Sequence, residues 1–204
     1  IECPAQLNQL AKKLSVIKLI RKRKVFLVPG LTFKDEEGIP DVMRGEESQI
    51  LGSSSTVDQK EQLICLPGSH SKWVRVSCGN VIAFSTYMTG ETYEAVRKNT
   101  ILSKTLEPDA WSEEAFMSGV QYSKTNKNIL SQLFHVRTQI LFHELSSDES
   151  TSFISGLLIG HELKSALQNS HGLKIHLIGD MALTKIYGDA ISEFGRTVIQ
   201  VDTD

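Results

Sequence analysis

The end of the chain changes from a strand pattern to a helix pattern and back again, and this order constrains the fold more than any other feature. Residues 173–179 form an apolar run that ends in glycine, residues 181–194 have helical periodicity, and residues 197–201 are a second short strand. A helix that joins two neighbouring strands of one sheet has to cross back over that sheet, so the two strands lie parallel. We therefore predict an α/β protein.

The middle of the chain supplies further strands and helices. Three strand patterns follow one another, and Cys78-Gly79-Asn80 is the predicted hairpin turn between the second and the third. The strands are predicted at residues 62–66, 73–77 and 81–88. The helices that follow are predicted near residues 91–98, 108–122, 129–135 and 148–168. The last of these helices has a broad apolar face that suits packing on a sheet.

The first part of the chain is predicted to contain two helices with a strand between them. Residues 4–19 have a moderate helical pattern, and residues 25–28 form a short β-branched run that predicts a buried strand. Residues 33–40 are a polar loop. Asp41 is then the predicted N-cap of a helix over residues 42–51, since a carboxylate can accept hydrogen bonds from the first free N–H groups of a helix.

A polar, serine-rich stretch at residues 52–61 predicts a linker. It is the best internal boundary of the chain, because the pattern turns to strands directly after it. We therefore expect one structural unit in residues 1–61 and a second in residues 62–204.

Charge and composition argue against several classes of protein. The chain has 204 residues, of which 40% are hydrophobic and 23% charged, as is ordinary for a soluble globular protein. Its net charge of −2 provides no overall attraction to nucleic acid or to an anionic membrane. The basic run at residues 18–24 is predicted to be a solvated helix end. For this reason we expect no nucleic-acid partner. Since no apolar stretch is long enough to cross a bilayer, we also expect no membrane partner.

The cysteines and histidines give no sign of a metal centre. Three cysteines, Cys3, Cys65 and Cys78, are too few and too scattered for a disulfide framework or a zinc site. An odd number of thiols suits a reducing compartment, so we expect a cytoplasmic protein. Four further histidines show no metal-ligand spacing with carboxylates: His135, His143, His161 and His171.

The segment Leu66-Pro67-Gly68-Ser69-His70-Ser71-Lys72-Trp73-Val74 is the strongest candidate for a binding site. It places glycine, two hydroxyls, a histidine and a lysine at a tight turn between two predicted strands. Such a turn offers backbone N–H groups, hydroxyl donors and a fixed positive charge, which together suit a phosphate. The alternative is a polar hairpin with incidental charges. Ser69 or Ser71 beside His70 does not indicate a serine hydrolase, because neighbours on a strand point to opposite faces and the G-x-S-x-G pattern is absent.

A second candidate precedes this turn, at Arg44-Gly45-Glu46-Glu47. Arginine offers a planar fork for a carboxylate or phosphate, and a neighbouring glutamate can act as a general base toward a hydroxyl. The alternative is a helix N-terminus, where acidic residues are favoured by the helix dipole and Arg44 is their partner.

Two further candidates follow the turn. Thr89 and Glu91 lie at the end of a predicted strand, where they can bind a polyol or cap the next helix. Gly179 and Asp180 lie where a strand ends and a helix begins, a place where nucleotides often bind, although a routine turn would have the same sequence. Gly156 and Gly160 lie four positions apart in the long helix predicted over residues 148–168. Close packing explains them better than the approach of a ligand does.

Taken in order, these segments resemble the 2-dehydro-3-deoxygalactonokinase family, sugar-acid kinases of the actin, hexokinase and Hsp70 ATPase superfamily. The resemblance covers nearly the whole chain. It is carried by PGL (29–31), DVMRGEESQILG (41–52), LPGSHSKWV (66–74), FSTYMTGE (84–91), QLFHVR (132–137), FISGLLIGHEL (153–163) and IHLIGDMALTKIY (175–187).

The resemblance implies a fold, a reaction and cofactors. The fold would consist of two ribonuclease-H-like lobes, actin-like ATPase lobes with a mixed sheet flanked by helices, and residues 1–61 would be the remainder of the N-terminal lobe. Residues 62–204 would be the C-terminal, ATP-binding lobe. The reaction would be the ATP- and Mg²⁺-dependent transfer of phosphate to the 6-hydroxyl of 2-dehydro-3-deoxy-D-galactonate.

The resemblance also implies roles for the candidate residues. Glu46, or else Glu47, would be the catalytic base, by similarity to the Gly-Asp that precedes the second phosphate loop in related carbohydrate kinases. Phosphate and nucleotide would be bound by Gly68, Ser69, Ser71, Lys72, Gly179 and Asp180. The sugar acid would be bound by Arg44, His70, Thr89 and Glu91. No metal ligand is indicated.

One departure from the family pattern concerns the start of the chain. Kinases of this family begin with a strand and an Asp-x-Gly-Ser/Thr turn that holds a phosphate and the metal, and nothing in residues 1–24 resembles it. We expect the chain to be a fragment with an incomplete N-terminal lobe. The alternative is a truncated, non-catalytic module that binds a nucleotide or a protein partner. A homodimer is left open.

Overall fold

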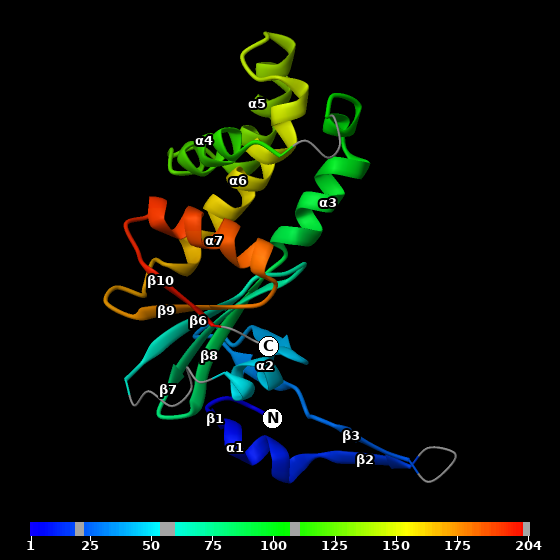
Figure 1. The fold of residues 1–204 in the computed structure, drawn as a ribbon, viewed down its shortest axis with the longest axis vertical. Helices are drawn as coiled ribbons and strands as arrows, with labels where there is room; N and C mark the ends of the chain where they lie inside the picture. The colour runs from blue at the N-terminus through cyan, green and yellow to red at the C-terminus, as the bar shows by residue number, and fades with distance from the viewer. Residues whose placement is uncertain (19–22, 54–59, 107–110, 202–204) are drawn as a thin grey trace.

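The computed structural model describes residues 1–18, 23–53, 60–106 and 111–201, and its centre is a mixed sheet of six strands (Figure 1). The strands lie in the order β1-β8-β7-β6-β9-β10. Their bounds are β1 Ala5–Gln6, β6 Gln62–Leu66, β7 Ser71–Ser77, β8 Asn80–Tyr87, β9 Lys174–Ile178 and β10 Val198–Val201. Strands β1, β8, β7 and β6 pair antiparallel, whereas β6, β9 and β10 pair parallel. The predicted α/β class and the parallel crossover are confirmed.

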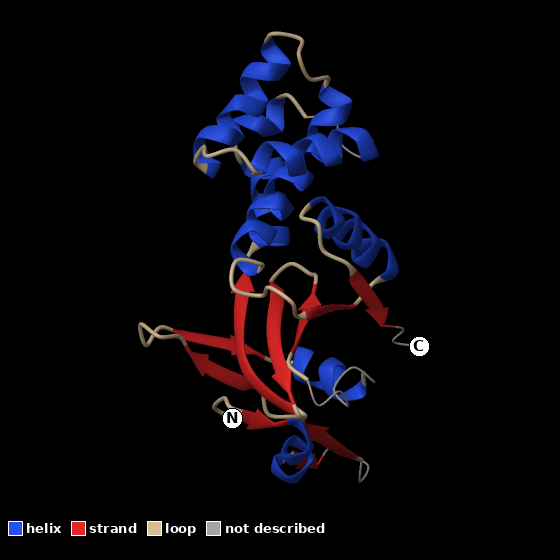
Figure 2. Ribbon diagram, turned by 90° about the vertical axis from the view of Figure 1, so that its left-hand side faces the viewer, coloured by secondary structure: helices blue, strands red, loops and turns tan. Residues whose placement is uncertain are grey.

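The helices of the second part of the chain lie together, above the sheet in the views of Figures 1 and 2. They are α3 Thr89–Asn99, the short η4 Ile101–Lys104, α4 Glu113–Ser123, α5 Ile129–Leu141, α6 Ser147–Ala166 and α7 Met181–Glu193. The predicted helices are confirmed in kind and order, and α5 continues one and a half turns further than predicted. Residues 108–110 of the predicted helix over 108–122 lie outside the described residues.

Alternation along the strands divides the core between the two faces of the sheet. On β6, Leu63 and Cys65 pack with α4, α6 and α7, and Trp73 of β7 joins them. The residues between them, including Ile64 and Val74, pack instead with the N-terminal segment. Because successive side chains point to opposite faces, a strand that is apolar at four consecutive positions, as β6 is from Leu63 to Leu66, suits a sheet covered on both sides.

The N-terminal segment covers the other face with short elements. These are α1 Leu7–Leu10, η1 Ala11–Lys13, β2 Ser15–Lys18, β3 Lys24–Leu27, β4 Leu31–Lys34, β5 Pro40–Met43 and α2 Glu46–Gly52. Strands β2 and β3 form a hairpin that projects from the body of the molecule, and β4 and β5 form a second one (Figure 1).

The predicted helix over residues 4–19 is wrong. Leu7 and Leu10 are buried as a helix would bury them, but the helical part stops within two turns. The β-branched Val16 and Ile17 then pair across an antiparallel hairpin with Phe26 and Val25. This hairpin also explains a second error, since the strand predicted as buried at 25–28 is largely exposed.

The polar loop predicted over residues 33–40 is confirmed at residues 35–39, but its ends belong to β4 and β5, and the Phe33 ring packs at a tilt against that of Phe84 with 5.9 Å between ring centroids. Two further predictions for this segment are wrong. Asp41 is in β5 and does not cap a helix, because α2 begins at Glu46 after Gly45. The ends of the basic run, Lys18 and Lys24, are paired strand residues rather than a helix end.

The predicted linker falls mainly on residues 54–59, which lie outside the described residues. The division into residues 1–61 and 62–204 therefore stays a prediction. The first part does add strand β1 to the edge of the sheet, beside β8.

Glycines let α4 and α6 touch backbone to backbone. A Cβ added to Gly119 would lie 2.1 Å from the carbonyl oxygen of Phe153, and one added to Gly156 would lie 1.9 Å from that of Phe116. Real side chains essentially never come so close, so both positions require glycine. The packing explanation for Gly156 is confirmed, and the same holds for Gly160, whose added Cβ would lie 2.1 Å from Ser123 Oγ.

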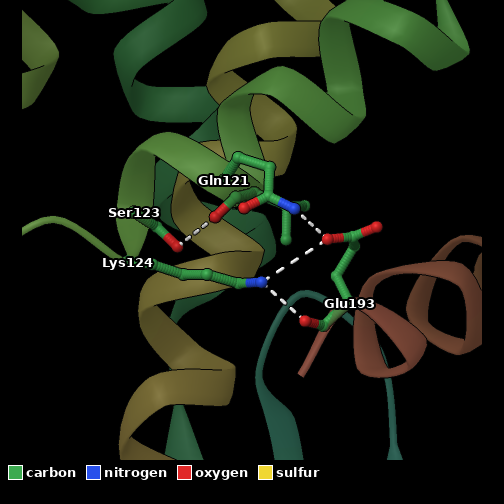
Figure 3. A network of polar contacts seen from close by, with 5 residues as sticks. Gln121, Ser123, Lys124 and Glu193 are labelled. Carbon is green, nitrogen blue, oxygen red and sulfur yellow. Dashed lines mark hydrogen bonds and ion pairs between the residues drawn. The ribbon is translucent and has the colours of Figure 1, made fainter. Parts of the chain in front are cut away.

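The C-terminal ends of α4 and α7 are joined by polar contacts (Figure 3). Lys124 Nζ donates to the carbonyl oxygen of Glu193 at 2.5 Å, and Gln121 Nε2 donates to its carboxylate. These contacts and the glycine-mediated packing hold α4, α6 and α7 together over the sheet.

No helix among the described residues is long and apolar enough to cross a membrane. In the same part of the chain, no group of three or more His, Cys, Asp or Glu side chains is placed to hold a metal ion.

Candidate functional site

Three of the predicted binding segments meet at one edge of the sheet. Strands β6 and β9 are parallel neighbours, so the turns that follow Leu66 and Ile178 lie at the same edge. Gly179 has φ +146°, and a Cβ added to it would lie 3.8 Å from the carbonyl oxygen of Pro67. The two turns are therefore in contact.

The start of α3 completes this group. A Cβ on Gly90 would lie 2.7 Å from the carbonyl oxygen of Gly68, so only glycine lets the helix approach so closely. The N–H of Glu91 donates to the carbonyl oxygen of Ser69 at 3.0 Å. Side chains from the two segments also meet, because His70 Nε2 contacts a carboxylate oxygen of Glu91 on the exposed surface.

A pocket of about 450 Å³ lies between these turns and the helices. Gly68, Ser69 and Gly90 contribute backbone and a hydroxyl to its lining. Helices α6 and α7 provide an apolar wall, with Leu158 and Leu183 among its residues. A pocket lined by apolar side chains together with backbone and hydroxyl groups suits a ligand with an apolar ring and a polar group.

The predicted cluster of Ser71 and Lys72 is divided between the two faces of the sheet. Ser71 is fully buried on the helix side, and its Oγ lies 2.8 Å from the hydroxyl oxygen of Tyr187. Lys72 is 6% exposed and points to the N-terminal side. There its Nζ donates to the carbonyl oxygen of Val42 at 2.8 Å and to Thr86 Oγ1 at 2.7 Å.

Asp41 completes the network around Lys72. Its carboxylate accepts the N–H of Thr86 at 2.7 Å and the Thr86 hydroxyl at 2.6 Å. The hydroxyl of Thr86 thus accepts from Lys72 and donates to Asp41. This network joins β5 to β7 and β8. Sequence reasoning missed it, because it took Asp41 as a helix cap and no local pattern connects residue 41 to residue 86.

A second network on the helix side has Glu162 at its centre. This residue of α6 is 3% exposed, and its carboxylate accepts hydrogen bonds from Trp73 Nε1 at 2.7 Å, from the Tyr187 hydroxyl at 2.9 Å and from Thr89 Oγ1. Burial raises the pKa of the Glu162 carboxyl above its ordinary value, while these hydrogen bonds oppose the increase. Burial also raises the pKa of the Tyr187 hydroxyl, and the neighbouring Glu162 adds to that shift.

Sequence reasoning missed Glu162 as well, although one signal was available. Glu162 follows Leu158 by four positions on the apolar face of the predicted helix. An acidic residue on such a face has to be paired or hydrogen-bonded, which marks it as a candidate for a special role.

Arg44, Glu46 and Glu47 lie on the N-terminal side of the sheet, at the start of α2. Glu46 Oε2 accepts the N–H of Arg44 at 2.9 Å, and Glu47 Oε2 accepts the N–H of Gly45 at 2.7 Å. Glu47 is only 1% exposed, whereas Glu46 is half-buried and Arg44 is exposed. The bond between Lys72 and Val42 holds this segment against the same edge of the sheet.

Thr89 and Asp180 both have partners within the protein. Thr89 begins α3 and donates inward to Glu162. Asp180 is exposed and caps α7, where its Oδ1 accepts the N–H groups of Ala182 at 3.0 Å and Leu183 at 3.1 Å.

Comparison with known proteins gives a consistent result. The family model 2-keto-3-deoxy-galactonokinase matches residues 1–204. A probable 2-dehydro-3-deoxygalactonokinase of Rhizobium meliloti (strain 1021) is 36% identical over 209 residues, which covers 100% of this chain and 68% of that protein. The 2-dehydro-3-deoxygalactonokinase of Escherichia coli (strain K12) is 32% identical over 181 residues, which covers 88% of this chain and 61% of that protein.

A solved structure agrees with these relatives. The crystal structure of a protein assigned as a 2-dehydro-3-deoxygalactonokinase from Sinorhizobium meliloti superimposes with a TM-score of 0.91 at 36% identity. The match covers 99% of this chain and 68% of that one. The chain thus spans between 61% and 68% of the length of these three proteins.

Proposed function

The chain belongs to the 2-keto-3-deoxy-galactonokinase family of carbohydrate kinases, and from this premise we propose that it takes part in the ATP-dependent phosphorylation of a sugar acid. The substrate would be 2-dehydro-3-deoxy-D-galactonate, with its 6-hydroxyl as the acceptor. The observation that carries the proposal is a pocket of about 450 Å³ lined by the turn after β6, the start of α3 and helices α6 and α7, with the turn after β9 in contact with the turn after β6. Phosphoryl transfer depends mainly on positioning and on charge neutralisation, which backbone N–H groups at such an edge can supply.

The pocket suggests how ATP would lie. The apolar wall formed by α6 and α7 would hold the adenine ring, and the turn with Gly179 would lie beside the ribose. The exposed carboxylate of Asp180 would accept hydrogen bonds from ribose hydroxyls while it caps α7. Backbone N–H groups near Gly68 and the hydroxyl of Ser69 would bind phosphate oxygens.

The sugar acid would lie on the N-terminal side of this edge. The exposed Arg44 offers two donors for its carboxylate, and His70, held by Glu91, offers a third. Both carboxylates accept a backbone N–H, but Glu46 is favoured over Glu47 as the general base because Glu46 is only half-buried, whereas Glu47 is 1% exposed. Lys72 would support the phosphate site indirectly, by holding β5 against the sheet.

Mg²⁺ would accompany ATP. The described residues contain no three-ligand cluster, but Mg²⁺ usually needs only one or two carboxylates together with substrate phosphates and water. We therefore assign no protein ligand to it. When bound, the ion neutralises charge on the transferring phosphate.

We also propose that residues 62–204 form a ribonuclease-H-like, ATP-binding lobe and that residues 1–61 belong to the substrate-side lobe. The antiparallel β6-β7-β8 meander followed by the parallel β9 supports this assignment. A cytoplasmic location and a homodimer remain predictions.

A coupled assay of ATP consumption tests the proposed reaction. The full-length gene product is expected to consume ATP only when 2-dehydro-3-deoxy-D-galactonate is present, and the gluconate epimer serves as the matched control. Glu46→Gln should lower kcat by at least ~100-fold, whereas Glu47→Gln should act mainly on stability. Absence of substrate-dependent turnover would overturn the proposal, and ATP binding without turnover would favour a non-catalytic module.

A further inference from the structure

The buried carboxylate of Glu162 does not line the pocket, but it accepts hydrogen bonds from two residues that do, Thr89 and Tyr187. We propose that Glu162 is a positioning residue for the nucleotide. It fixes Thr89 and Tyr187 in the arrangement that binds ATP. Through Tyr187 it also fixes the turn at residues 67–70, which we call the phosphate turn. The proposal rests on the proposed function of the pocket and adds a determinant that does not touch the ligand.

The geometry places Glu162 at a junction of four elements. It lies on α6, and its three donors come from β7, α3 and α7. Two of these donors, Thr89 and Tyr187, also line the pocket. The third, Trp73, is not among the residues that line this pocket, so it anchors the carboxylate from the side of the sheet.

A chain of hydrogen bonds connects Glu162 to the residue that follows the phosphate turn, and each bond has a defined donor. Tyr187 has one hydroxyl proton, and it is donated to Glu162. The Tyr187 oxygen therefore accepts from Ser71, whose Oγ is 2.8 Å away. Ser71 directly follows the turn at residues 67–70, so the relay runs from the end of that turn through Tyr187 to Glu162.

The same helix also forms part of the pocket. Leu158 and Ile159 lie one turn before Glu162 on α6, and both line the pocket. A shift of α6 relative to α7 would move the apolar wall and the relay together. Glu162 opposes such a shift, because its bonds to Thr89 and Tyr187 hold α3 and α7 against α6.

A purely structural role would not require a carboxylate at this position. Burying a charge is costly, and an apolar side chain of similar volume is often as stabilising as a buried polar group. A fully satisfied polar network instead fixes one arrangement of the elements that it joins, because each hydrogen bond has a required direction. The network around Glu162 joins the elements that form the pocket.

Glu162→Gln keeps the size and shape of the side chain but reverses the donors and acceptors in the chain of hydrogen bonds from Ser71 through Tyr187 to residue 162. The amide oxygen of Glu162→Gln would be needed by Trp73, which can only donate, so the amide NH₂ would face Thr89 and Tyr187. Both hydroxyls would then have to accept. Tyr187 would donate to Ser71 instead, and Ser71 would turn its proton toward the carbonyl oxygen of Gly68, which lies 3.5 Å from its Oγ.

The test measures ATP binding by calorimetry and KM values for both substrates in the full-length gene product. Glu162→Gln, Tyr187→Phe and Thr89→Val are each expected to raise the Kd of ATP by about tenfold, while KM for the sugar acid stays within about twofold. Tyr87→Phe is the matched control. It removes another hydroxyl that bonds α6, at Ser165 Oγ 3.1 Å away, but it lies outside the pocket, so ATP binding should be unchanged.

The outcomes separate the two proposals. If the wild-type protein binds no ATP, the proposed function is overturned, and this inference with it. If the wild type binds ATP and the three variants bind it equally well, the inference alone is overturned. The same holds if Tyr87→Phe weakens ATP binding as much as Tyr187→Phe does, or if KM rises equally for both substrates. Such results would indicate a general loss of packing.

Discussion

Ser71 and Lys72 are neighbours in one sequence motif, yet they belong to two different regions of the molecule. Ser71 joins the network of Glu162 on the helix side, where all the partners lie in residues 71–187. Lys72 joins the network of Asp41 on the N-terminal side, where the Thr86 hydroxyl accepts from Lys72 and donates to Asp41. The helix-side network shapes a pocket, whereas the N-terminal-side network holds one segment of the chain against another. The comparison teaches that neighbouring residues of one short motif can belong to networks with different roles, one beside a pocket and one between two parts of the chain.

The largest expected effect compares the closest helix contact of the helix side with an open helix position of the N-terminal side. Gly156→Ala would place a methyl group against the carbonyl oxygen of Phe116, and we expect it to lower the free energy of unfolding by about 3 kcal/mol. Gly52→Ala, in α2, is the matched control, because nothing lies within 4 Å of its added Cβ. It should stabilise by up to ~1 kcal/mol. Urea denaturation of both variants checks this, and equal effects would show that the two sides are packed alike.

The next effect tests whether Lys72 joins the N-terminal segment to the sheet. Lys72→Met keeps the length of the side chain but removes both hydrogen bonds of a nearly buried ammonium, so we expect a loss of about 2 kcal/mol. Lys34→Met, at an exposed position of β4, should change stability by less than ~0.5 kcal/mol. Hydrogen exchange should also speed up at β5 in Lys72→Met but not in α6. Equal protection of both would contradict the division into two networks.

A smaller effect concerns pH and belongs to the helix side alone. Because burial raises the pKa of Glu162, the folded state holds its proton at pH values where the unfolded chain has lost it. This contribution to stability is complete below the ordinary carboxyl pKa of 4.5 and is lost as pH rises through the higher folded value. The Tm of wild type relative to Glu162→Gln should therefore fall as pH rises above 4.5. A difference in Tm that does not change with pH would contradict this.

The smallest effect on stability is expected at the rim of the site. His70 and Glu91 form an exposed contact, so His70→Asn should change the free energy of unfolding by no more than ~0.5 kcal/mol. If His70 binds the sugar-acid carboxylate, the same variant should raise KM for the sugar acid by about tenfold and leave the Kd of ATP unchanged. Kinetics with both substrates would show whether the rim serves the substrate, and an unchanged KM would remove His70 from the site.

The fold of residues 62–201 could be predicted because its patterns are local. Strand β6 is apolar from Leu63 to Leu66, Cys78-Gly79-Asn80 has the composition of a tight turn, and α6 shows a broad apolar face. The segment before residue 53 was predicted poorly for a physical reason. The apolar positions from Leu7 onward fit helical spacing, but Val16 and Ile17 find strand partners in a hairpin, and tertiary pairing overrides a weak periodicity.

The candidate site was predictable in part. The turns at Gly68 and Gly179 were found as local patterns, whereas their meeting at one edge follows from the parallel pairing of β6 with β9, which only the structure shows. Asp41 and Glu162 could not be found in this way. Their partners lie far away in the sequence, and an acidic residue in a predicted loop or helix indicates its partner only when the fold is known.

The opposite orientation of Ser71 and Lys72 has a consequence for how this motif can change in evolution. An insertion or deletion of one residue just before Trp73 would move the side chains of Ser71 and Lys72 to the opposite faces of the sheet, because side chains along a strand alternate with a period of two. Ser71 would then face Val42, and the lysine would be driven into the apolar helix side beside Tyr187. We expect the spacing between this turn and Trp73 to tolerate no change in length among functional relatives, even where the residues themselves vary.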